Sequence, residues 1–375
     1  MAILTRRNFN LGLLTSLSSL AFWRPVYGQS ADVFTIAGTG IASISSTALD
    51  EAVAFRTDIN TPYGLDTGPD NALYFCEVHT GFIKRIDLRS NQIRTIAGNG
   101  DKRFEAESRN PLQAPFYSPH EIRWDDENSL YVVERDSHCV KRIDGRTGLV
   151  TTLAGNGQAG FQGDEGSAVL SRLQQPHSIA FDSKGNLLIC DLGNNRLRRV
   201  SRETGLIDTV AGTGFQALAP LAAPMKGTPL AGPRALATDR DGNAYLALRE
   251  GNAILKLDLD SNSLEKIAGT GEPGYSGDGG DALKATFNAP KGIAYSSRDN
   301  SLYVADTENH AIRKIQLGSG LVTTVLGSGI AGDGPDGDPT QCQLNRPHGV
   351  CVFEQVIYIA DSENHRIRAM TGIVN

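Results

Sequence analysis

Short runs of alternating apolar and polar residues recur along the whole chain, and this period of two predicts β-strands rather than helices. The clearest repeating unit contains four such runs, at residues 178–181, 187–190, 196–200 and 206–211. Residues rich in Gly, Asn and Asp separate the runs, as in the Asp-Ser-Lys-Gly-Asn segment 182–186, which is typical of antiparallel hairpins. The pattern therefore predicts one four-stranded antiparallel sheet per unit.

The unit repeats at a fixed interval. A phrase resembling Thr-Ile-Ala-Gly, first seen at residues 35–38, occurs six times at intervals of 57 to 60 residues. A second phrase, proline followed by one variable residue, occurs six times at intervals of 57: Pro62-Tyr63, Pro119-His120, Pro176-His177, Pro233-Arg234, Pro290-Lys291 and Pro347-His348. A long fixed period indicates a propeller, a solenoid or an array, and four short strands per repeat form the blade of a β-propeller.

The two ends of the chain are expected to meet in the last blade. The sixth unit has strand-like runs near 348–353, 356–360 and 366–370 but no fourth run before Asn375. A spare fourth-strand phrase lies at the other end, from Val33 to Ala37. We expect this N-terminal strand to complete the sixth blade and remove its open edge. Residues 32–375 are therefore predicted to form one all-β domain, a six-bladed β-propeller.

Segments of the repeat resemble the NHL-repeat family. The likeness is carried by Pro-His-Ser-Ile at 176–179, by Asp-Leu-Gly-Asn-Asn-Arg-Leu at 191–197, and by Asp-Ser-Glu-Asn-His-Arg-Ile at 361–367. It covers all six units and implies the propeller fold, but NHL repeats occur in binding scaffolds and in enzymes alike. His138, His310 and His365 match the Asn-His signature of this repeat and are expected to be structural.

Residues 1–28 differ from the rest of the chain. A basic segment with paired Arg6 and Arg7 precedes a mildly apolar run from Leu11 to Phe22 and then small residues, an order typical of a secretory signal. The paired arginines followed by Phe9 resemble a twin-arginine export signal. We therefore expect a protein exported in the folded state, periplasmic or secreted.

Charge and composition narrow the classes of partner. The chain carries 36 basic and 42 acidic residues, and loss of the basic residues in 1–28 raises the negative net charge from −6 to −9. Such a balance disfavours nucleic acids and anionic membrane surfaces as partners. No uninterrupted apolar run of about 18 residues predicts a membrane span. Five cysteines show no metal-type spacing, and only Cys342 and Cys351 are considered for a disulfide.

One side chain per unit is expected to face the central channel, because the residue after each conserved-spacing proline starts the innermost strand. In blade order these positions are Tyr63, His120, His177, Arg234, Lys291 and His348. Neutral histidine binds metals and carries protons near pH 7. Tyrosine can transfer a proton, and Arg and Lys can hold a carboxylate, a phosphate or a developing oxyanion.

A second set of positions lies 13 to 15 residues further on, at the ends of the second strands: Glu77, Glu134, Asp191, Leu248, Asp306 and Asp361. Two interpretations are open for the acids, which either orient the ring histidines or tie down their own turns. Leu248 leaves Arg234 without the acid found in the other blades, which makes its guanidinium a candidate anion hook. Glu121, where other blades have small residues, is a candidate base.

The ring is similar to that of peptidyl-hydroxyglycine amidating lyases, six-bladed relatives that hold zinc with three histidines in Pro-His phrases. This resemblance implies a divalent metal, zinc first, on His120, His177 and His348, assisted by Tyr63 and Arg234. The present chain departs from that pattern, because its histidines fall on blades two, three and six rather than on alternate blades.

Two hypotheses about function follow. The first is an exported, metal-assisted lyase or hydrolase of a small anionic substrate, with Tyr63, Arg234 and Glu121 as catalytic residues and Arg234 and Lys291 binding the anion. The second is a non-enzymatic module whose channel face binds a small molecule, a peptide, a glycan or another protein. We expect a monomer in both cases.

Overall fold

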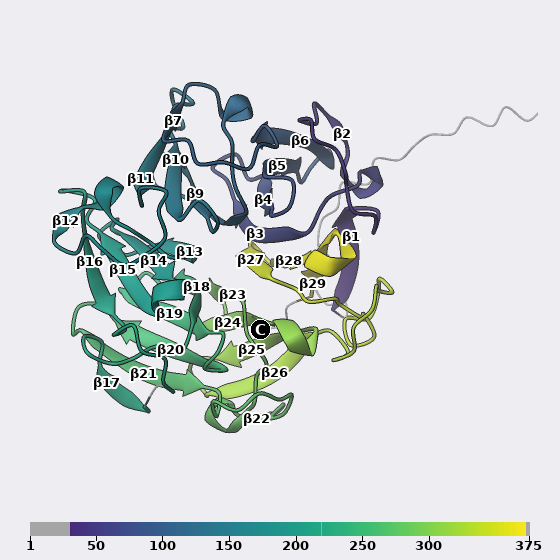
Figure 1. The fold of residues 1–375 in the computed structure, drawn as a ribbon. Coiled ribbons are helices and arrows are strands. Elements are labelled where there is room, and N and C mark those ends of the chain that lie inside the picture. The colour runs from purple at the N-terminus through teal and green to yellow at the C-terminus, as the bar shows by residue number, and fades with distance from the viewer. Residues whose placement is uncertain (1–30, 219, 373–375) are drawn as a thin grey trace, which may run out of the picture.

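A computed structural model describes residues 31–218 and 220–372, and these form six antiparallel sheets arranged around a central axis (Figure 1). The predicted signal segment 1–28 lies outside the described residues. No helix among the described residues is long and apolar enough to cross a membrane. The all-β propeller with six blades is therefore confirmed.

The first three blades follow one another along the chain. Blade one contains β2 (Ala52–Val53), β3 (Pro62–Thr67), β4 (Leu73–Glu77), β5 (Phe82–Asp87) and β6 (Gln92–Ala97). Blade two contains β7 (Glu107–Ser108), β8 (Pro119–Trp124), β9 (Leu130–Glu134), β10 (Cys139–Ile143) and β11 (Val150–Ala154). Blade three contains β12 (Gly166–Ser167), β13 (Pro176–Phe181), β14 (Leu187–Asp191), β15 (Arg196–Val200) and β16 (Leu206–Ala211).

The remaining blades complete the ring. Blade four contains β17 (Ala222–Pro224), β18 (Pro233–Thr238), β19 (Asn243–Leu248), β20 (Ala253–Asp258) and β21 (Ser263–Ala268). Blade five contains β22 (Gly280–Asp281), β23 (Gly292–Ser296), β24 (Ser301–Asp306), β25 (Ala311–Gln316) and β26 (Leu321–Leu326). Blade six contains β27 (Gly349–Phe353), β28 (Val356–Asp361), β29 (Arg366–Thr371) and β1 (Asp32–Ala37).

Single 3₁₀ turns interrupt the connections between strands. They are η1 (Ala54–Arg56), η2 (Pro111–Gln113), η3 (Ala168–Leu170), η4 (Leu192–Asn194), η5 (Ala282–Lys284), η6 (Thr307–Asn309) and η7 (Ser362–Asn364). The last two and η4 form the turn between the second and third strands of their blades, on the face where the innermost strands begin.

The closure predicted from the sequence is confirmed. Strand β1 pairs with β29 in antiparallel register, with Asp32 opposite Thr371 and Thr35 opposite Arg368. The guanidinium of Arg368 also donates to the Thr35 hydroxyl at 3.0 Å. The N-terminal and C-terminal strands therefore share one sheet, and the propeller closes on itself (Figure 1).

Five blades contain a fifth strand that the alternation pattern did not predict. In each, two or three residues of the incoming connection pair with the outermost strand, as Gly166 does with Ile207 in blade three. In blade six Val33 exchanges two backbone hydrogen bonds with Gly337, at 2.8 and 2.7 Å. The connections thus cover the outer edges of the blades, where unpaired backbone groups would otherwise invite pairing with other chains.

The core lies between neighbouring blades. The second strand of every blade is almost wholly buried, since it is packed on both faces by the adjacent sheets. Glycines let the innermost strands approach: a Cβ on Gly349 would lie 2.1 Å from the carbonyl oxygen of Tyr63, and one on Gly292 would lie 2.3 Å from that of His348. Any side chain at these two positions would push the innermost strands apart.

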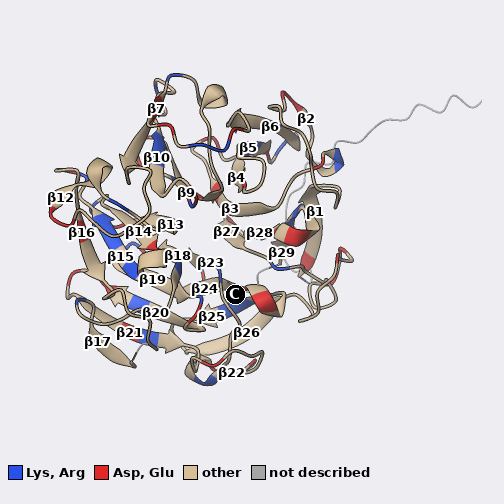
Figure 2. Cartoon of the chain, viewed as in Figure 1, with Lys and Arg blue, Asp and Glu red and all other residues tan. Residues whose placement is uncertain are grey.

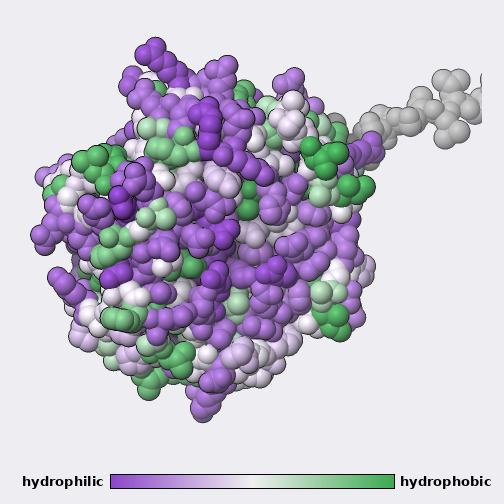
Figure 3. All heavy atoms as spheres, in the orientation of Figure 1, coloured by the Kyte–Doolittle hydropathy of each residue, from purple (hydrophilic) through white to green (hydrophobic). Residues whose placement is uncertain are grey.

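Charged residues of both signs are distributed over all blades, and basic residues recur on the third strands, including β10, β15 and β20 (Figure 2). The surface seen in Figure 3 is mostly hydrophilic, with apolar residues in small separate groups. All five cysteines are buried and unpaired, so Cys342 and Cys351 do not form a disulfide in this structure.

Candidate functional site

The predicted ring positions converge, and four of their side chains form a continuous row of contacts. The rings of Tyr63 and His348 stack with centroids 3.9 Å apart and an interplanar angle of 12°. His120 meets Tyr63 edge-on at 5.0 Å and meets His177 edge-on at 4.8 Å. Side chains from blades six, one, two and three therefore touch one another across the innermost strands.

The three ring histidines share one hydrogen-bonding arrangement. The Nδ1 atom of each lies 2.7–2.9 Å from the backbone carbonyl of the residue two positions earlier: Ser118, Gln175 and Arg346. A carbonyl can only accept, so Nδ1 carries the proton and donates it. In the neutral imidazole the lone pair then lies on Nε2, which is free to accept a hydrogen bond or bind a metal.

Burial keeps these imidazoles neutral. Desolvation lowers the pKa of His120 and of His177 well below the usual value, and the nearby Arg234 guanidinium adds to the effect. For His348 desolvation again comes first, followed by the positive charges of Lys291 and Arg234. Burial conversely raises the pKa of the Tyr63 phenol, so this group stays protonated and can donate.

Arg234 is the exceptional member of the ring. Its side chain lies in a residue that is only 3% exposed, yet it makes no hydrogen bond or ion pair within residues 31–218 and 220–372. Desolvation lowers the pKa of Arg234 to about 10, opposed by the charges of Tyr63 and Glu121. A buried charge without a hydrogen-bonded partner is costly, which makes this guanidinium a binding position for an anion.

Lys291 is held differently from Arg234. Its Nζ lies 2.6 Å from Oε1 of Glu308 in the turn η6, and Arg346 donates to the same carboxylate from blade six. Desolvation lowers the pKa of Lys291 to about 8, although Glu308 favours the charged form. Burial opposes ionisation of Glu308, but the hydrogen bonds from Arg346 and Lys291 outweigh it and lower its pKa to about 2. Lys291 therefore enters the ring already paired.

The buried acids at the ends of the second strands do not contact the ring histidines. Each accepts a hydrogen bond from a backbone N–H of the preceding loop, as Asp191 does from Gln174 at 2.7 Å. Each also pairs with a base seven residues later on the third strand: Lys84, Lys141, Arg198, Arg313 and Arg368. Of the two interpretations left open by the sequence, the structure supports the one in which these acids tie down their own turns.

Blade four lacks both members of this pair. Leu248 replaces the acid and Leu255, seven residues later, replaces the base, and both side chains are fully buried. An apolar pair of this kind can replace a buried ion pair without loss of stability. The absence of an acid at Leu248 therefore does not explain why Arg234 is unpaired, because the corresponding acids in other blades face away from the ring residues.

Glu121 lies deeper in the channel, where it accepts a hydrogen bond from Arg123 at 2.6 Å. Desolvation raises the pKa of Glu121, opposed by the charges of Arg123 and then Arg234. The packing explains why this position is small in other blades: a Cβ on Gly64 of blade one would lie 2.6 Å from Cα and Oε1 of Glu121. The role of Glu121 as a base stays a prediction.

The predicted zinc site is tested only for its geometry. Among residues 31–218 and 220–372, no three His, Cys, Asp or Glu side chains are placed to hold one metal ion. Tyr63 lies between His348 and His120 in the row of rings, and the guanidinium of Arg234 adds positive charge beside the imidazoles. The arrangement of the described residues thus fits an anion more readily than a shared cation, and no step below depends on a metal.

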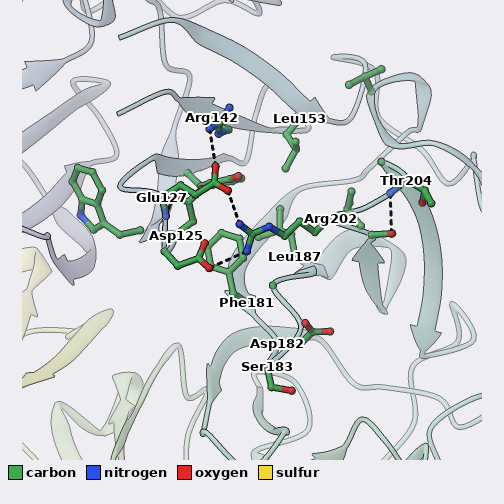
Figure 4. Close-up of a pocket in the computed structure, with 18 of the residues that line it drawn as sticks. Asp125, Glu127, Arg142, Leu153, Phe181, Asp182, Ser183, Leu187, Arg202 and Thr204 are labelled. Atoms are coloured by element: carbon green, nitrogen blue, oxygen red, sulfur yellow. Dashed lines mark hydrogen bonds and ion pairs between the residues drawn. The ribbon is translucent and has the colours of Figure 1, made fainter. Parts of the chain in front are cut away.

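Two cavities lie away from the ring. One of about 330 Å³ is lined by the far ends of the innermost strands, including Asp66, Arg123 and Tyr295, at the other end of the channel. One of about 610 Å³ lies between blades two and three, where Arg202 crosses from blade three to Asp126 and Glu127 (Figure 4). Its lining comes from turns on the face opposite the ring.

Glu308 and Arg346 were not among the residues singled out from the sequence. Glu308 occupies the turn between the second and third strands, and Arg346 directly precedes the proline of blade six. Both turns were expected on the ring face. Their positions therefore contained the signal, although their pairing with Lys291 could not be derived without the contacts.

Comparison with known proteins agrees with this architecture. The model of the NHL repeat matches residues 173–199, 287–315 and 344–370, in blades three, five and six. Protein SUPPRESSOR OF QUENCHING 1, chloroplastic, of Arabidopsis thaliana is 29% identical over 312 residues, which cover 80% of this chain and 29% of that protein. The chain spans less than half the length of the curated relatives that match most of it, among them the NHL repeat-containing protein 2 sequences.

Solved structures share the fold at low sequence identity. An auxiliary nutrient binding protein from Bacteroides thetaiotaomicron superposes with a TM-score of 0.65 at 19% identity, over 92% of this chain and 77% of that one. Virginiamycin B lyase from Staphylococcus aureus superposes with a TM-score of 0.52 at 14% identity, over 92% of this chain and all of that one. At these identities the likeness shows the fold alone. The repeats, the six sheets and the matches together identify the chain as an NHL-repeat β-propeller.

Proposed function

We propose that the ring of Tyr63, His120, His177, Arg234, Lys291 and His348 binds a small anionic molecule in the central channel. The observation that carries the proposal is the buried guanidinium of Arg234, which has no hydrogen-bonding partner among the described residues. A carboxylate or phosphate group would supply two acceptors for its planar array of donors. Binding would also neutralise a charge that burial disfavours.

The other ring groups define what such a ligand carries besides its charge. The bare Nε2 atoms of His120, His177 and His348 are acceptors, so they favour a ligand with hydroxyl or amide N–H groups. The protonated phenol of Tyr63 adds a donor. We therefore infer a hydroxylated or amide-containing anion, such as a hydroxy acid or the carboxyl end of a peptide. One structural neighbour is described as a nutrient binding protein, which is compatible with ligand binding.

Metal-assisted lyase or hydrolase chemistry is the second candidate. The observation favouring it is that all three histidines hold Nδ1 on a carbonyl and leave Nε2 without its proton, the form that binds zinc or accepts a proton. A zinc ion bound there would act as a Lewis acid towards the substrate. Elemental analysis of protein prepared without a His-tag tests this candidate: one zinc per chain that disappears in His177→Ala supports it, and metal-free protein contradicts it.

Anion binding is tested by titrating the protein with inorganic phosphate and with lactate at low ionic strength and following thermal stability. A ligand that binds only the folded state raises the melting temperature by mass action. We expect the increase in wild type, its loss in Arg234→Met, and its persistence in Arg298→Met, where the arginine is exposed. Equal shifts in all three proteins would contradict the proposal.

We further propose that the protein is exported and acts in the periplasm or outside the cell, on the basis of residues 1–28. Cell fractionation and N-terminal sequencing of the mature protein test this step. We expect a new N-terminus after Gly28 or Ala31, and an intact Met1 in the cytoplasmic fraction would contradict it.

A further inference from the structure

The residue that starts the third strand of a blade bonds to the backbone of the next blade. In five blades this residue is His or Asn with a positive φ of 43–51°. Nδ1 of His138, His310 and His365 accepts from the backbone N–H of Gln175, Arg346 and Thr61, at 3.1–3.2 Å. Oδ1 of Asn195 and Asn252 accepts in the same way from Gly232 and Ala289, at 3.1 and 2.9 Å.

In two blades the bonded residue is the one whose carbonyl orients a ring histidine. Gln175 accepts Nδ1–H of His177 at 2.7 Å, and Arg346 accepts Nδ1–H of His348 at 2.8 Å. Both residues have a left-handed backbone, with φ of 49° and 48°. A residue other than glycine pays a conformational cost there and keeps this shape only where its surroundings hold it.

We propose that His138 and His310 are positioning residues for the channel site. Each holds the left-handed backbone of one residue of the next blade, whose carbonyl then fixes the tautomer and direction of His177 or His348. The inference rests on the proposed function only in taking the ring as the place where a ligand binds. It goes beyond the structural role expected for these histidines, because it connects them to the Nε2 atoms that face a ligand.

The two connections differ in strength. Gln175 has no side-chain hydrogen bond among residues 31–218 and 220–372, so the bond from His138 is its main lateral restraint. Arg346 is also held through its own guanidinium by Glu308. Blade one has Gly81 at this place, and Ser118 is held instead by its hydroxyl, which donates to Asp136 at 2.5 Å. Loss of the His138 bond should therefore have the larger effect.

The arrangement requires neutral histidines, because a protonated Nδ1 cannot accept a hydrogen bond. Desolvation lowers the pKa of His138, with Asp136 opposing and Arg135 adding to the shift. Desolvation likewise lowers the pKa of His310, opposed by Glu308 and supported by Arg346. Both are thus neutral near pH 7, and acid removes the acceptor. The asparagines at the same place in blades three and four cannot titrate.

The chain itself offers matched variants. His138→Asn and His310→Asn reproduce the bond found in blades three and four without a titrating group, and His138→Gly and His310→Gly reproduce blade one without backbone strain. Nitrogen NMR of the imidazoles is practical because the chain has seven histidines. In wild type at pH 7.5 we expect His177 and His348 to show one tautomer, with the proton on Nδ1.

We expect His138→Gly to convert the His177 signals to a mixture of tautomers, His310→Gly to affect His348 less, and the asparagine variants to match wild type. On acidification, wild type should lose the single tautomer of His177 at a higher pH than His138→Asn does. Inorganic phosphate should bind about fivefold more weakly to His138→Gly, the value of one hydrogen bond.

An unchanged His177 tautomer in His138→Gly, or identical pH profiles for wild type and His138→Asn, would overturn the proposal. These spectra are recorded without ligand, so they decide the positioning role even if phosphate does not bind. Failure of phosphate to bind wild type, with the tautomer effects present, would instead count against the proposed function alone.

Discussion

Replacing Arg234 with methionine should stabilise the protein in the absence of ligand while removing anion binding. Arg234 is 3% exposed and its guanidinium is unpartnered among the described residues, so its charge is desolvated without compensation. Methionine has a similar length and no charge, and its flexible side chain can fill the same space. The same substitution at a well-paired buried arginine would be destabilising.

The magnitude follows from the pKa. Desolvation lowers the pKa of Arg234 from 12.5 to about 10, and one pKa unit corresponds to about 1.4 kcal/mol. At pH 7 the side chain is protonated in both folded and unfolded states, so the whole penalty, about 3 kcal/mol, opposes folding. Lost packing offsets part of the gain, and we expect Arg234→Met to unfold with a free energy about 1–3 kcal/mol higher.

Urea denaturation in a buffer without phosphate or carboxylate measures this difference, with Arg298→Met as the exposed control. The expected control value lies within about 0.5 kcal/mol of wild type. If Arg234→Met is instead less stable than wild type by 1 kcal/mol or more, the guanidinium already has a partner within the folded chain. The reasoning behind the anion site would then fail.

Three further predictions concern the framework of the site. Gly349→Ala places a Cβ 2.1 Å from the Tyr63 carbonyl and should cost about 1–3 kcal/mol in urea denaturation, whereas Gly318→Ala, with open space around it, should be neutral. Arg313→Leu leaves the buried Asp306 carboxylate without its base and should cost about 3–5 kcal/mol, while a double-mutant cycle with Asp306→Leu should show that the two costs are less than additive, as the Leu248 and Leu255 pair implies; strict additivity would contradict this. The pKa of Glu308, lowered from 4.5 to about 2, means that its ionised form stabilises the fold above pH 4.5 and that this contribution disappears as the pH falls towards 2. Wild type should therefore lose more stability than Glu308→Gln over that interval, and parallel curves would refute the assignment.

The fold and the membership of the ring were predictable because repetition constrains both. A fixed interval of 57 residues places equivalent residues at equivalent points of equivalent blades, so Tyr63, His120 and His348 had to approach one axis. The strand boundaries of the third unit, at 187, 196 and 206, were also recovered from alternation alone. The two-residue outer strands were missed, since a pair of residues is too short to show any period.

The partners inside the site were harder to derive. The carbonyl that orients His177 depends on the left-handed backbone of Gln175, and glutamine gives no sign of a positive φ in a sequence. The bases that pair with the buried acids were visible at a spacing of seven residues, as in Asp191 and Arg198, and their joint loss in blade four could have resolved the two interpretations.

A crystal structure of the protein grown with selenate tests the central claim most directly, because the anomalous signal of selenium locates the anion without reference to the protein. The account predicts one selenate per chain in the channel, within hydrogen-bonding distance of the Arg234 guanidinium and beside Tyr63 and His177. A channel without an anion, or an Arg234 side chain bonded to another part of the chain, would contradict it.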